Sequence, residues 1–491
     1  MANRLHFWEI FKDVPNGRKI AYTDVDEITS ENIVSVIGSC IGVHNLNKSA
    51  IKYLWEYKNG DQPVRYRTKT MRDDIKNVIV ENHAWEIVRF KNAQSNGEPR
   101  QLVATEKEDK TNKSVDLFNK YTNAARKQKA DVSCGEWVSA VGFGYEGVIL
   151  KHGNKIPIGY VSLNPLTTFI IYSSKTQEPM LSVEELKDEK GEHYLHCFSE
   201  THEYTIKNSN VVDVRLHIFG GIPIVEKCNN QSRVSDIELV IDLLDAINEL
   251  TSNRSDSVAQ FVQSWLKFVN CAIDEETFKK MKMLGALVVK SNNGSDNKAD
   301  VDVISQELNQ TQTQTYKEDL WNNVLSISAI PSKGDGSGSG DRAGATYLRE
   351  GWDFAKQAAR LKDVYELDAE MRLAEITLNV LRTELKDKEI WDISPLQYEV
   401  QIPHSPTDNM QCKAQVFTML VGAGIHPLVA IKTCGLWVDS ESTYEMSKPY
   451  LDVLYKTIDT LVENASEQEK KANQMVKEMS DAGIISNGRT E

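Results

Sequence analysis

The chain has 491 residues, of which 40% are hydrophobic and 26% charged, and 71 acidic side chains against 57 basic ones give a formal net charge of −14. This length accommodates several hydrophobic cores. The acidic balance excludes a protein that grips nucleic acid over a broad surface, because such binding needs Lys and Arg to neutralise phosphates. It leaves open a surface along which DNA passes without adhering, since like charges repel.

The sequence predicts neither a secretory signal nor a membrane span. Residues 1–10 lack the apolar core of a signal peptide. Residues 417–438 are apolar, but His426, Pro427 and Lys432 interrupt them, so we expect a pair of buried helices. Seven scattered cysteines without a C-x-x-C pair are typical of a reducing cytoplasm.

The first half of the chain changes from a helical to a β pattern. Residues 1 to about 130 carry amphipathic runs, and Gly60 follows one of them where a glycine commonly ends a helix. From Gly135 to about Cys228, short alternating apolar segments separated by turn residues predict antiparallel hairpins. The helical runs are 30–43, 49–57, 71–90 and 115–130.

A long helical rod follows the β region. Residues 232–270 place apolar side chains at helical spacing, while residues 251–257 are polar all round. A helix over the whole range would reach roughly 55 Å, which is more than one small domain needs. We therefore expect either one rod with a polar centre or two helices joined by a kink.

A small α/β knob and a returning rod come next. Within residues 271–308 we expect a short helix over 274–283 and two strands, 286–290 and 300–304. Residues 309–329 again carry helical spacing. The chain thus goes out along one rod, forms a knob and returns along another.

A glycine-rich loop separates the returning rod from a long helix. Residues 329–345 hold five glycines, so the backbone is free to adopt many conformations and cannot pack as core. The helix begins near residues 341–343 and continues for about forty residues, with a seam that we expect to pack against another helix of the same or a neighbouring chain. The seam residues are Val364, Leu367, Met371, Ala374, Leu378, Leu381 and Leu385. Residues 396–402 predict a strand, and a helical region follows from a cap at Asp408 or Asn409.

The sequence offers no convincing catalytic or metal site. Residues 338–343 match the G-x-G-x-x-A dinucleotide pattern, but that pattern needs a preceding strand and here a predicted helix precedes it. A metal site could be suspected from the cluster His193, His196, Cys197 and His202. Since side chains alternate along a strand, His193 and His196 would point to different faces of the sheet, which disfavours such a site. We expect no catalytic residue, no metal and no cofactor.

The order of these elements resembles the portal proteins, or head-to-tail connectors, of tailed double-stranded DNA bacteriophages. Residues 220–256, with Ile-Pro-Ile, paired asparagines and the run IDLLDA, are similar to the stretch with which siphophage-type portals enter their stem. Residues 402–447 are similar to the C-terminal helical pattern of that family, and residues 57–67 and 124–149 carry weaker similarity. The resemblance covers most of residues 50–447.

The resemblance implies an α+β, mainly helical portal fold around a central channel. Its regions would be the wing (1–231), the outgoing stem helix (232–270), the clip (271–308), the returning stem helix (309–329), the tunnel loop (330–345), the long wing helix (346–395) and the crown (396–491).

The resemblance also implies a function without an active site. The chain would be one subunit of a ring, usually of twelve copies, that forms a channel for DNA entry during packaging and exit during ejection. It would lie at the portal vertex of the virion, and in the host cytoplasm before assembly. Implied partners are DNA, the terminase large subunit, a head-completion or adaptor protein, the major capsid protein and the scaffold. Two alternatives stay open from the residues alone: a nucleotide-binding enzyme that uses residues 338–343, and a cytoplasmic helical scaffold.

The tunnel loop carries the implied DNA contacts. In the family this loop lines the narrowest part of the channel and touches the passing DNA. The residues so assigned are Lys333, Gly334, Gly336, Gly338, Gly340 and Arg342. Asp335 and Asp341 offset the two cations, so the loop is expected to meet DNA without a strong net attraction.

Overall fold

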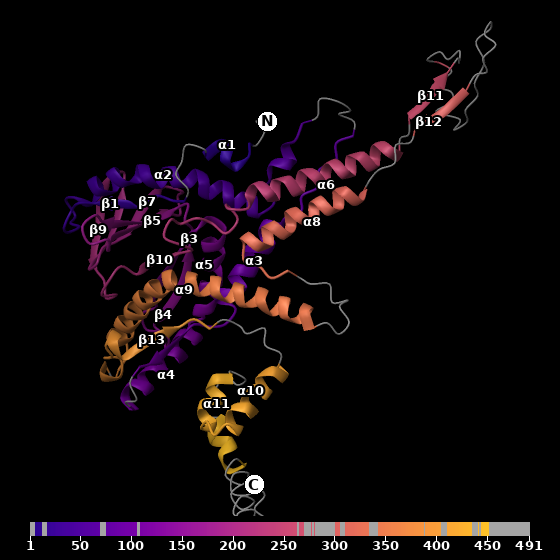
Figure 1. Cartoon of the computed structure of the whole chain (residues 1–491). Coiled ribbons are helices and arrows are strands. Elements are labelled where there is room, and N and C mark those ends of the chain that lie inside the picture. Colours follow the sequence, from indigo (N-terminus) through magenta and orange to yellow (C-terminus); the bar gives the residue numbers. More distant parts are fainter. Residues whose placement is uncertain are drawn as a thin grey trace, which may run out of the picture. The chain divides into compact units, whose positions relative to one another are not determined.

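The computed structural model shows a mixed, mainly helical α+β protein (Figure 1), as the sequence predicts. It divides into two compact units, residues 1–405 and 406–491. The structure describes residues 5–11, 17–68, 75–105, 109–262, 265–269, 276, 279, 300–304, 310–332, 342–386, 388–403, 410–434, 440 and 443–450.

The N-terminal part of the first unit is helical, as predicted, but its helices differ in extent from the sequence expectation. The expected runs 30–43 and 49–57 form one continuous helix, after which Gly60 adopts a φ of +92°. Within the expected run 71–90, residues 75–82 are not helical. The helices are α1 (Phe7–Phe11), α2 (Ile33–Lys58), α3 (His83–Asn96), α4 (Asp109–Ala124) and α5 (Lys127–Val141).

The predicted start of the β region at Gly135 is wrong, because α5 continues to Val141. Gly135 serves helix packing, since a Cβ at this position would overlap the amide groups of Asn92 and Asn96 on α3. The helix ends at Gly142, whose φ of +98° is the left-handed conformation that favours glycine. Glycine therefore marks a close helix contact at one position and a helix end at the other.

Two sheets follow, and the predicted antiparallel hairpins are confirmed. A six-stranded sheet has the order β1-β5-β6-β7-β8-β9, and a three-stranded sheet has the order β10-β3-β4. Only the short β1 pairs in parallel, with β5, among the described strands. The strands are β1 (Ala21–Thr23), β3 (Phe143–Leu150), β4 (Ile158–Leu163), β5 (Thr168–Ser173), β6 (Pro179–Lys187), β7 (His193–Phe198), β8 (His202–Lys207), β9 (Asn210–Leu216) and β10 (Ile224–Cys228).

Two hydrophobic cores hold the first unit together. The smaller one joins the first turns of α2, such as Ile33 and Ile37, to one face of the six-stranded sheet, including Ile171 and Leu181. The larger one joins the second half of α2, together with α1, α3 to α5 and the later helices of the first unit, to the three-stranded sheet. Burial of these apolar side chains is the main term that stabilises the fold.

The outgoing rod is shorter than predicted. Its helix, α6, spans Ile241–Val262, and the expected helix over 232–270 is wrong at both ends. At the start, the Ser235 hydroxyl accepts hydrogen bonds from the backbone N–H groups of Ile237 and Glu238, which satisfies these donors in a turn.

At the other end of the rod, strand β11 (Trp265–Val269) pairs antiparallel with β12 (Asp300–Ile304). The alternating residues of β11 therefore form a ladder instead of a helix. The predicted strand 300–304 is confirmed as β12. Its expected partner, residues 286–290, lies outside the described residues, and so does most of the helix expected over 274–283.

The returning rod and the long helix are confirmed. Helix α8 spans Gln310–Ile327 and α9 spans Arg342–Glu384. Of the predicted seam, Ala374, Leu378 and Leu381 are buried within this chain, whereas Val364 is 64% exposed. Short turns η2 (Lys388–Ile390) and η3 (Pro395–Gln397) lead to β13 (Tyr398–Gln401), the predicted strand, which pairs with β2 (Gln101–Ala104).

The second unit contains α10 (Met410–Gly422) and α11 (Pro427–Cys434). The predicted pair of helices is confirmed, although the expected cap at Asp408 or Asn409 lies outside the described residues. The expectation that both helices are buried is wrong for α10 in this chain alone, because Met419 is 71% exposed, whereas α11 buries Ala430, Ile431 and Cys434. No helix in the described part of the chain is long and apolar enough to cross a membrane.

Candidate channel loop and its supports

The loop between α8 and α9 begins with a strained helix end. The backbone N–H of Ile330 donates to the carbonyl of Leu325 at 2.9 Å, and that of Ala329 donates to Ser326 at 3.2 Å. This is the hydrogen-bond pattern of a Schellman motif, whose left-handed position glycine usually fills. Ala329 occupies it instead, with a φ of 50°. An alanine there costs about 1–2 kcal/mol, so the surrounding structure holds the chain in this turn.

The two flanks of the loop meet at Pro331 and Gly351. A Cβ on Gly351 would lie 3.7 Å from Pro331, so the end of the α8 turn passes close to α9. Helix α9 begins at Arg342, nine residues before this contact and thus about 13.5 Å along its axis. The first turns of α9 therefore extend past the contact.

Most of the predicted loop residues lie outside the described residues. They are Lys333, Gly334, Gly336, Gly338 and Gly340. Arg342 is the first residue of α9, and its side chain also lies outside the description. The element before the G-x-G-x-x-A sequence is the helix α8, so the dinucleotide pattern lacks the strand that it requires.

A row of polar side chains on α6 binds an extended segment of the chain. The backbone N–H groups of alternate residues in segment 75–82 donate to side chains four residues apart on α6, at 2.6–3.0 Å. The pairs are Glu81 with Asn248, Ile79 with Ser252, and Asn77 with Asp256. Two residues of extended chain and four residues of helix advance by similar lengths, about 6.6 and 6.0 Å. The polar centre of α6 thus holds residues 75–82 in a non-helical conformation.

Helix α8 is anchored on the same segment. The Lys317 ammonium lies 2.6 Å from the Glu81 carboxylate, and Trp321 stacks on His83 with ring centroids 4.0 Å apart. Hydrogen bonds from His83, and then from Lys317 and Thr251, lower the pKa of Glu81 to about 2 against the opposing effect of burial. Glu81 therefore stays ionised and links both rods to the N-terminal part.

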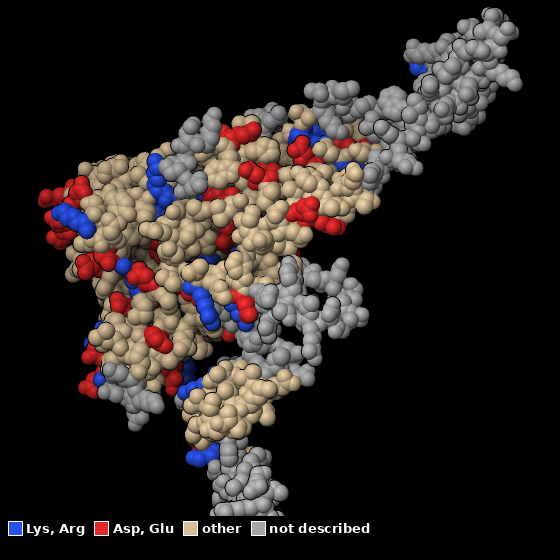
Figure 2. All heavy atoms as spheres, viewed as in Figure 1, with Lys and Arg blue, Asp and Glu red and all other residues tan. Residues whose placement is uncertain are grey.

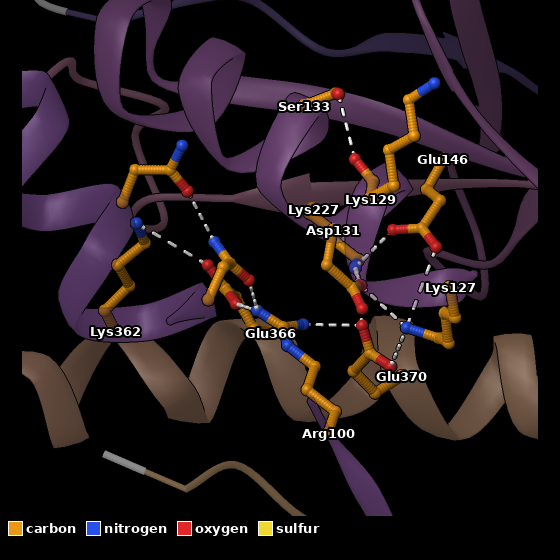
Figure 3. A network of polar contacts seen from close by, with 12 residues as sticks. Arg100, Lys127, Lys129, Asp131, Ser133, Glu146, Lys227, Lys362, Glu366 and Glu370 are labelled. Carbon is orange, nitrogen blue, oxygen red and sulfur yellow. Dashed lines mark hydrogen bonds and ion pairs between the residues drawn. The ribbon is translucent and has the colours of Figure 1, made fainter. Parts of the chain in front are cut away.

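Buried ion pairs fix α9 on the rest of the first unit (Figure 3). The cluster combines side chains from α5, β3, β10, α9 and the residue before β2, and its members are between 0% and 7% exposed except for Lys127. Those side chains are Arg100, Lys127, Asp131, Glu146, Lys227, Glu366 and Glu370. We call this set the buried ion cluster.

Lys227 lies at the centre of the buried ion cluster. Its Nζ is 2.7 Å from Asp131 and 2.5 Å from both Glu146 and Glu370. Burial, with the Asp131 carboxylate, raises the pKa of Glu146 to about 7. Burial also opposes ionisation of Glu370, but Lys127 and Lys227 outweigh it and lower that pKa to about 2.

The buried ion cluster is not a metal site. Among the described residues, Asp131, Glu146 and Glu370 form the one group of three whose oxygens are close enough to hold an ion. The Nζ atoms of Lys127 and Lys227 already contact these oxygens, so ammonium groups supply the positive charge that a metal would bring.

The histidine-rich strands do not form a metal site either. His193 pairs with Glu185 at 2.7 Å, and His196 pairs with Glu203 at 2.8 Å. Cys197 is fully buried on the face that packs against α2. The side chains thus have separate partners, as the alternation along a strand predicts.

On the face in view, acidic side chains are spread over the described residues, including the end of the first unit formed by the six-stranded sheet (Figure 2). The face in view has no continuous basic band of the kind that grips a DNA backbone. The described residues thus combine an out-and-back helix pair, α6 and α8, with a long helix, α9, that buried ion pairs fix in place.

Comparison with known families identifies the class of protein. A family model described as "Phage portal protein, SPP1 Gp6-like" matches residues 37–480. The protein is therefore a phage portal protein, a structural and non-enzymatic component of the virion's portal vertex. It belongs to the SPP1 Gp6-like portal family, whose members form oligomeric rings with a channel at the capsid vertex for DNA packaging and ejection.

Other comparisons add little to this assignment. No curated protein matches the sequence. Among solved structures, the neck of an empty GTA particle, computed with C6 symmetry, has 10% sequence identity and a TM-score of 0.43 over 72% of this chain and 90% of that chain.

Proposed function

We propose that twelve copies of this chain form the portal ring and that residues 330–345 are its tunnel loop. In this assignment residues 1–231 and the long helix over 346–395 form the wing. Helices α6 and α8 form the stem, residues 271–308 the clip, and residues 396–491 the crown. The antiparallel α6–α8 pair and the β11–β12 ladder at its end support the stem and clip assignment.

The arrangement of α8 and α9 at the base of the loop supports the proposal that the loop contacts DNA. Pro331 lies close to Gly351, so the α8 flank of the loop passes beside α9, which begins nine residues earlier. We propose that this base presents the tunnel loop to the channel. In a ring, every copy presents the same segment at the same radius. Lys333 and Arg342 are the proposed DNA contacts, and the loop glycines allow these cations to follow a moving polymer.

We propose the remaining partners from the family assignment. The terminase large subunit docks on the ring during packaging, and a head-completion or adaptor protein docks afterwards. The major capsid protein and the scaffold contact the ring during capsid assembly. The charge balance suits this role, because an acidic channel protein repels DNA except where a few cations face it.

The test removes the two loop cations. The double variant Lys333→Ala with Arg342→Ala is expected to form rings of normal subunit number by native mass spectrometry, while DNA packaging or retention in particles falls. The control, Lys175→Ala with Arg215→Ala, removes the same charge from exposed side chains on the six-stranded sheet. Unchanged packaging by the loop variant would reject the loop contacts, and a subunit number other than twelve would reject the proposed stoichiometry.

A further inference from the structure

Between residues 354 and 370, helix α9 buries charged side chains and exposes large apolar ones, which is the reverse of an ordinary surface helix. Lys362, Glu366 and Glu370 recur every four residues on the buried face. Four large apolar side chains lie on the outward face, where a helix that meets only water carries polar residues. They are Phe354, Leu361, Val364 and Tyr365, which are 56%, 71%, 64% and 43% exposed. We call this set the apolar stripe.

The buried ion cluster fixes the apolar stripe in its outward position. Turning α9 to bury Leu361 would move Glu366 and Glu370 away from Arg100 and Lys227. Buried charges without partners are costly, commonly more so than the exposure of a few apolar side chains. The ion pairs therefore fix α9 in a rotation that leaves the apolar stripe exposed. An exposed apolar surface of this kind marks an interaction site.

A groove of matching character lies between α3 and α5. Its volume is about 390 Å³, and apolar side chains such as Trp85, Val88 and Val132 line it. Trp85 and Val132 are 46% and 42% exposed. The groove can therefore receive apolar side chains from another molecule.

The stripe and the groove lie on opposite flanks of the α3–α9 pair. On α3, Phe90 and Gln94 face α9, since the Phe90 ring lies 5.9 Å from that of Trp352 and the Gln94 amide donates to the carbonyl of Ala355 at 2.8 Å. At about 100° per residue, Trp85 points to the opposite side of α3. By the same geometry Leu361 points away from the α3-facing side of α9. A closed ring of identical subunits needs two complementary patches on opposite flanks of each copy.

We infer that the apolar stripe of one copy docks into the α3–α5 groove of the neighbouring copy. The occupant is a second copy of this chain, because the family assembles as rings in which each subunit presents one flank to the other flank of the next. The inference rests on the proposed ring and assigns it a specific interface. It also gives the buried ion cluster a role in assembly, as the device that keeps the stripe outward.

The first experiment places charges in the stripe. Native mass spectrometry over a dilution series measures the protein concentration at which rings dissociate to monomers. For the variant Leu361→Glu with Val364→Glu, this concentration is expected to be at least roughly tenfold higher than for the wild type. Circular dichroism and thermal melting of the variant monomer should match those of wild-type monomer diluted until its rings have dissociated, because both side chains are exposed in the single chain. The matched control is Leu396→Glu, at a leucine that is 85% exposed outside the stripe.

The second experiment tests the pairing of stripe and groove. The variant Leu361→Cys with Val132→Cys is expected to give a ladder of disulfide-linked multimers on mild oxidation of assembled rings. Each single variant carries the same native cysteines and should give no ladder. Rings of the glutamate variant that are as stable as wild type, or no ladder from intact rings of the double cysteine variant, would overturn the inference. Absence of rings from the wild type would overturn the proposed function as well.

Discussion

At the scale of single residues, His44 makes the stability of the first unit depend on pH. The ring stacks on Phe169 with centroids 4.5 Å apart, and its Nε2–H donates to the carbonyl of Leu166 at 3.3 Å. Burial, and then the nearby Lys48 ammonium, lower the pKa of His44 to about 4, although Glu185 acts in the opposite sense. The folded protein therefore holds this imidazole neutral down to low pH.

The direction of this pH effect on stability follows from comparing how many protons the folded and the unfolded chain bind. Between the ordinary pKa of 6.5 and the folded value of about 4, the unfolded chain binds a proton that the folded chain does not, so stability falls as the pH falls. We expect His44 to account for about 2–3 kcal/mol of the loss between pH 7 and pH 4. Urea unfolding of the wild type and of His44→Gln, followed by tryptophan fluorescence, measures the difference. The gap between the two proteins should shrink as the pH falls, and parallel pH profiles would contradict the assignment.

At the scale of elements, the position of α9 depends on the buried ion cluster. The Lys227 ammonium contacts three carboxylates from α5, β3 and α9. Lys227→Met leaves these carboxylates with too few cations in a buried site, so we expect a loss of about 3–5 kcal/mol in the free energy of unfolding. Lys129→Met is the control, because Lys129 is an exposed lysine on the same helix as Asp131 and should change stability by less than about 0.5 kcal/mol (Figure 3).

A rescue variant separates charge balance from packing in the same cluster. Adding Glu146→Gln to Lys227→Met removes one of the uncompensated carboxylates and should restore part of the lost stability. Thermal melting of Lys227→Met and of the double variant measures this. A double variant that is no more stable than the single one would show that Lys227 acts through its volume instead of its charge.

The long elements could be predicted from the sequence because their signals are local. The spacing of apolar residues indicated α8 and α9, and the glycine-rich loop between them was correctly placed between two helices. The sequence reveals the polar centre of α6 but not its role, because its partners lie in residues 75–82. A run of polar residues four apart, Asn248, Ser252 and Asp256, was the available signal.

The buried ion cluster could not be predicted for a related reason. Glu366 and Glu370 resemble solvent-facing residues of a surface helix, and their partner Arg100 is 266 and 270 residues away in the sequence. Helical spacing identified a leucine seam, of which Leu378 and Leu381 are buried, whereas Val364 is exposed. The face that α9 turns inward is thus decided by tertiary ion pairs that local periodicity does not reveal.

At the scale of the whole molecule, the acidic charge balance sets how the ring meets DNA. With a net charge of −14 per copy, the ring repels a polyanion over most of its surface. Contact is then restricted to segments where cations face the channel. In the loop, Asp335 and Asp341 balance Lys333 and Arg342, so the proposed contact surface is close to neutral. Weak attraction is what a channel needs if DNA is to move in both directions.

Neutralising the loop carboxylates should turn this weak contact into a grip. In Asp335→Asn with Asp341→Asn, each copy presents two unbalanced cations, and the ring repeats them around the axis. We expect short duplex DNA to bind the purified ring roughly tenfold more tightly at low salt, with a steeper loss of affinity as salt rises, because more counterions are released. Gel retardation across a salt series measures both quantities.

The control makes the same change in charge elsewhere. Asp26→Asn with Asp392→Asn removes two carboxylates that are 84% and 76% exposed and lie outside the loop. If the loop lines the channel, this control should bind DNA as the wild type does, and packaging should slow only in the loop variant. Equal affinities of both variants would mean that DNA responds to the net charge of the ring and does not contact the loop. Only a rise confined to the loop variant assigns the contact to residues 330–345, since the two variants carry the same total charge.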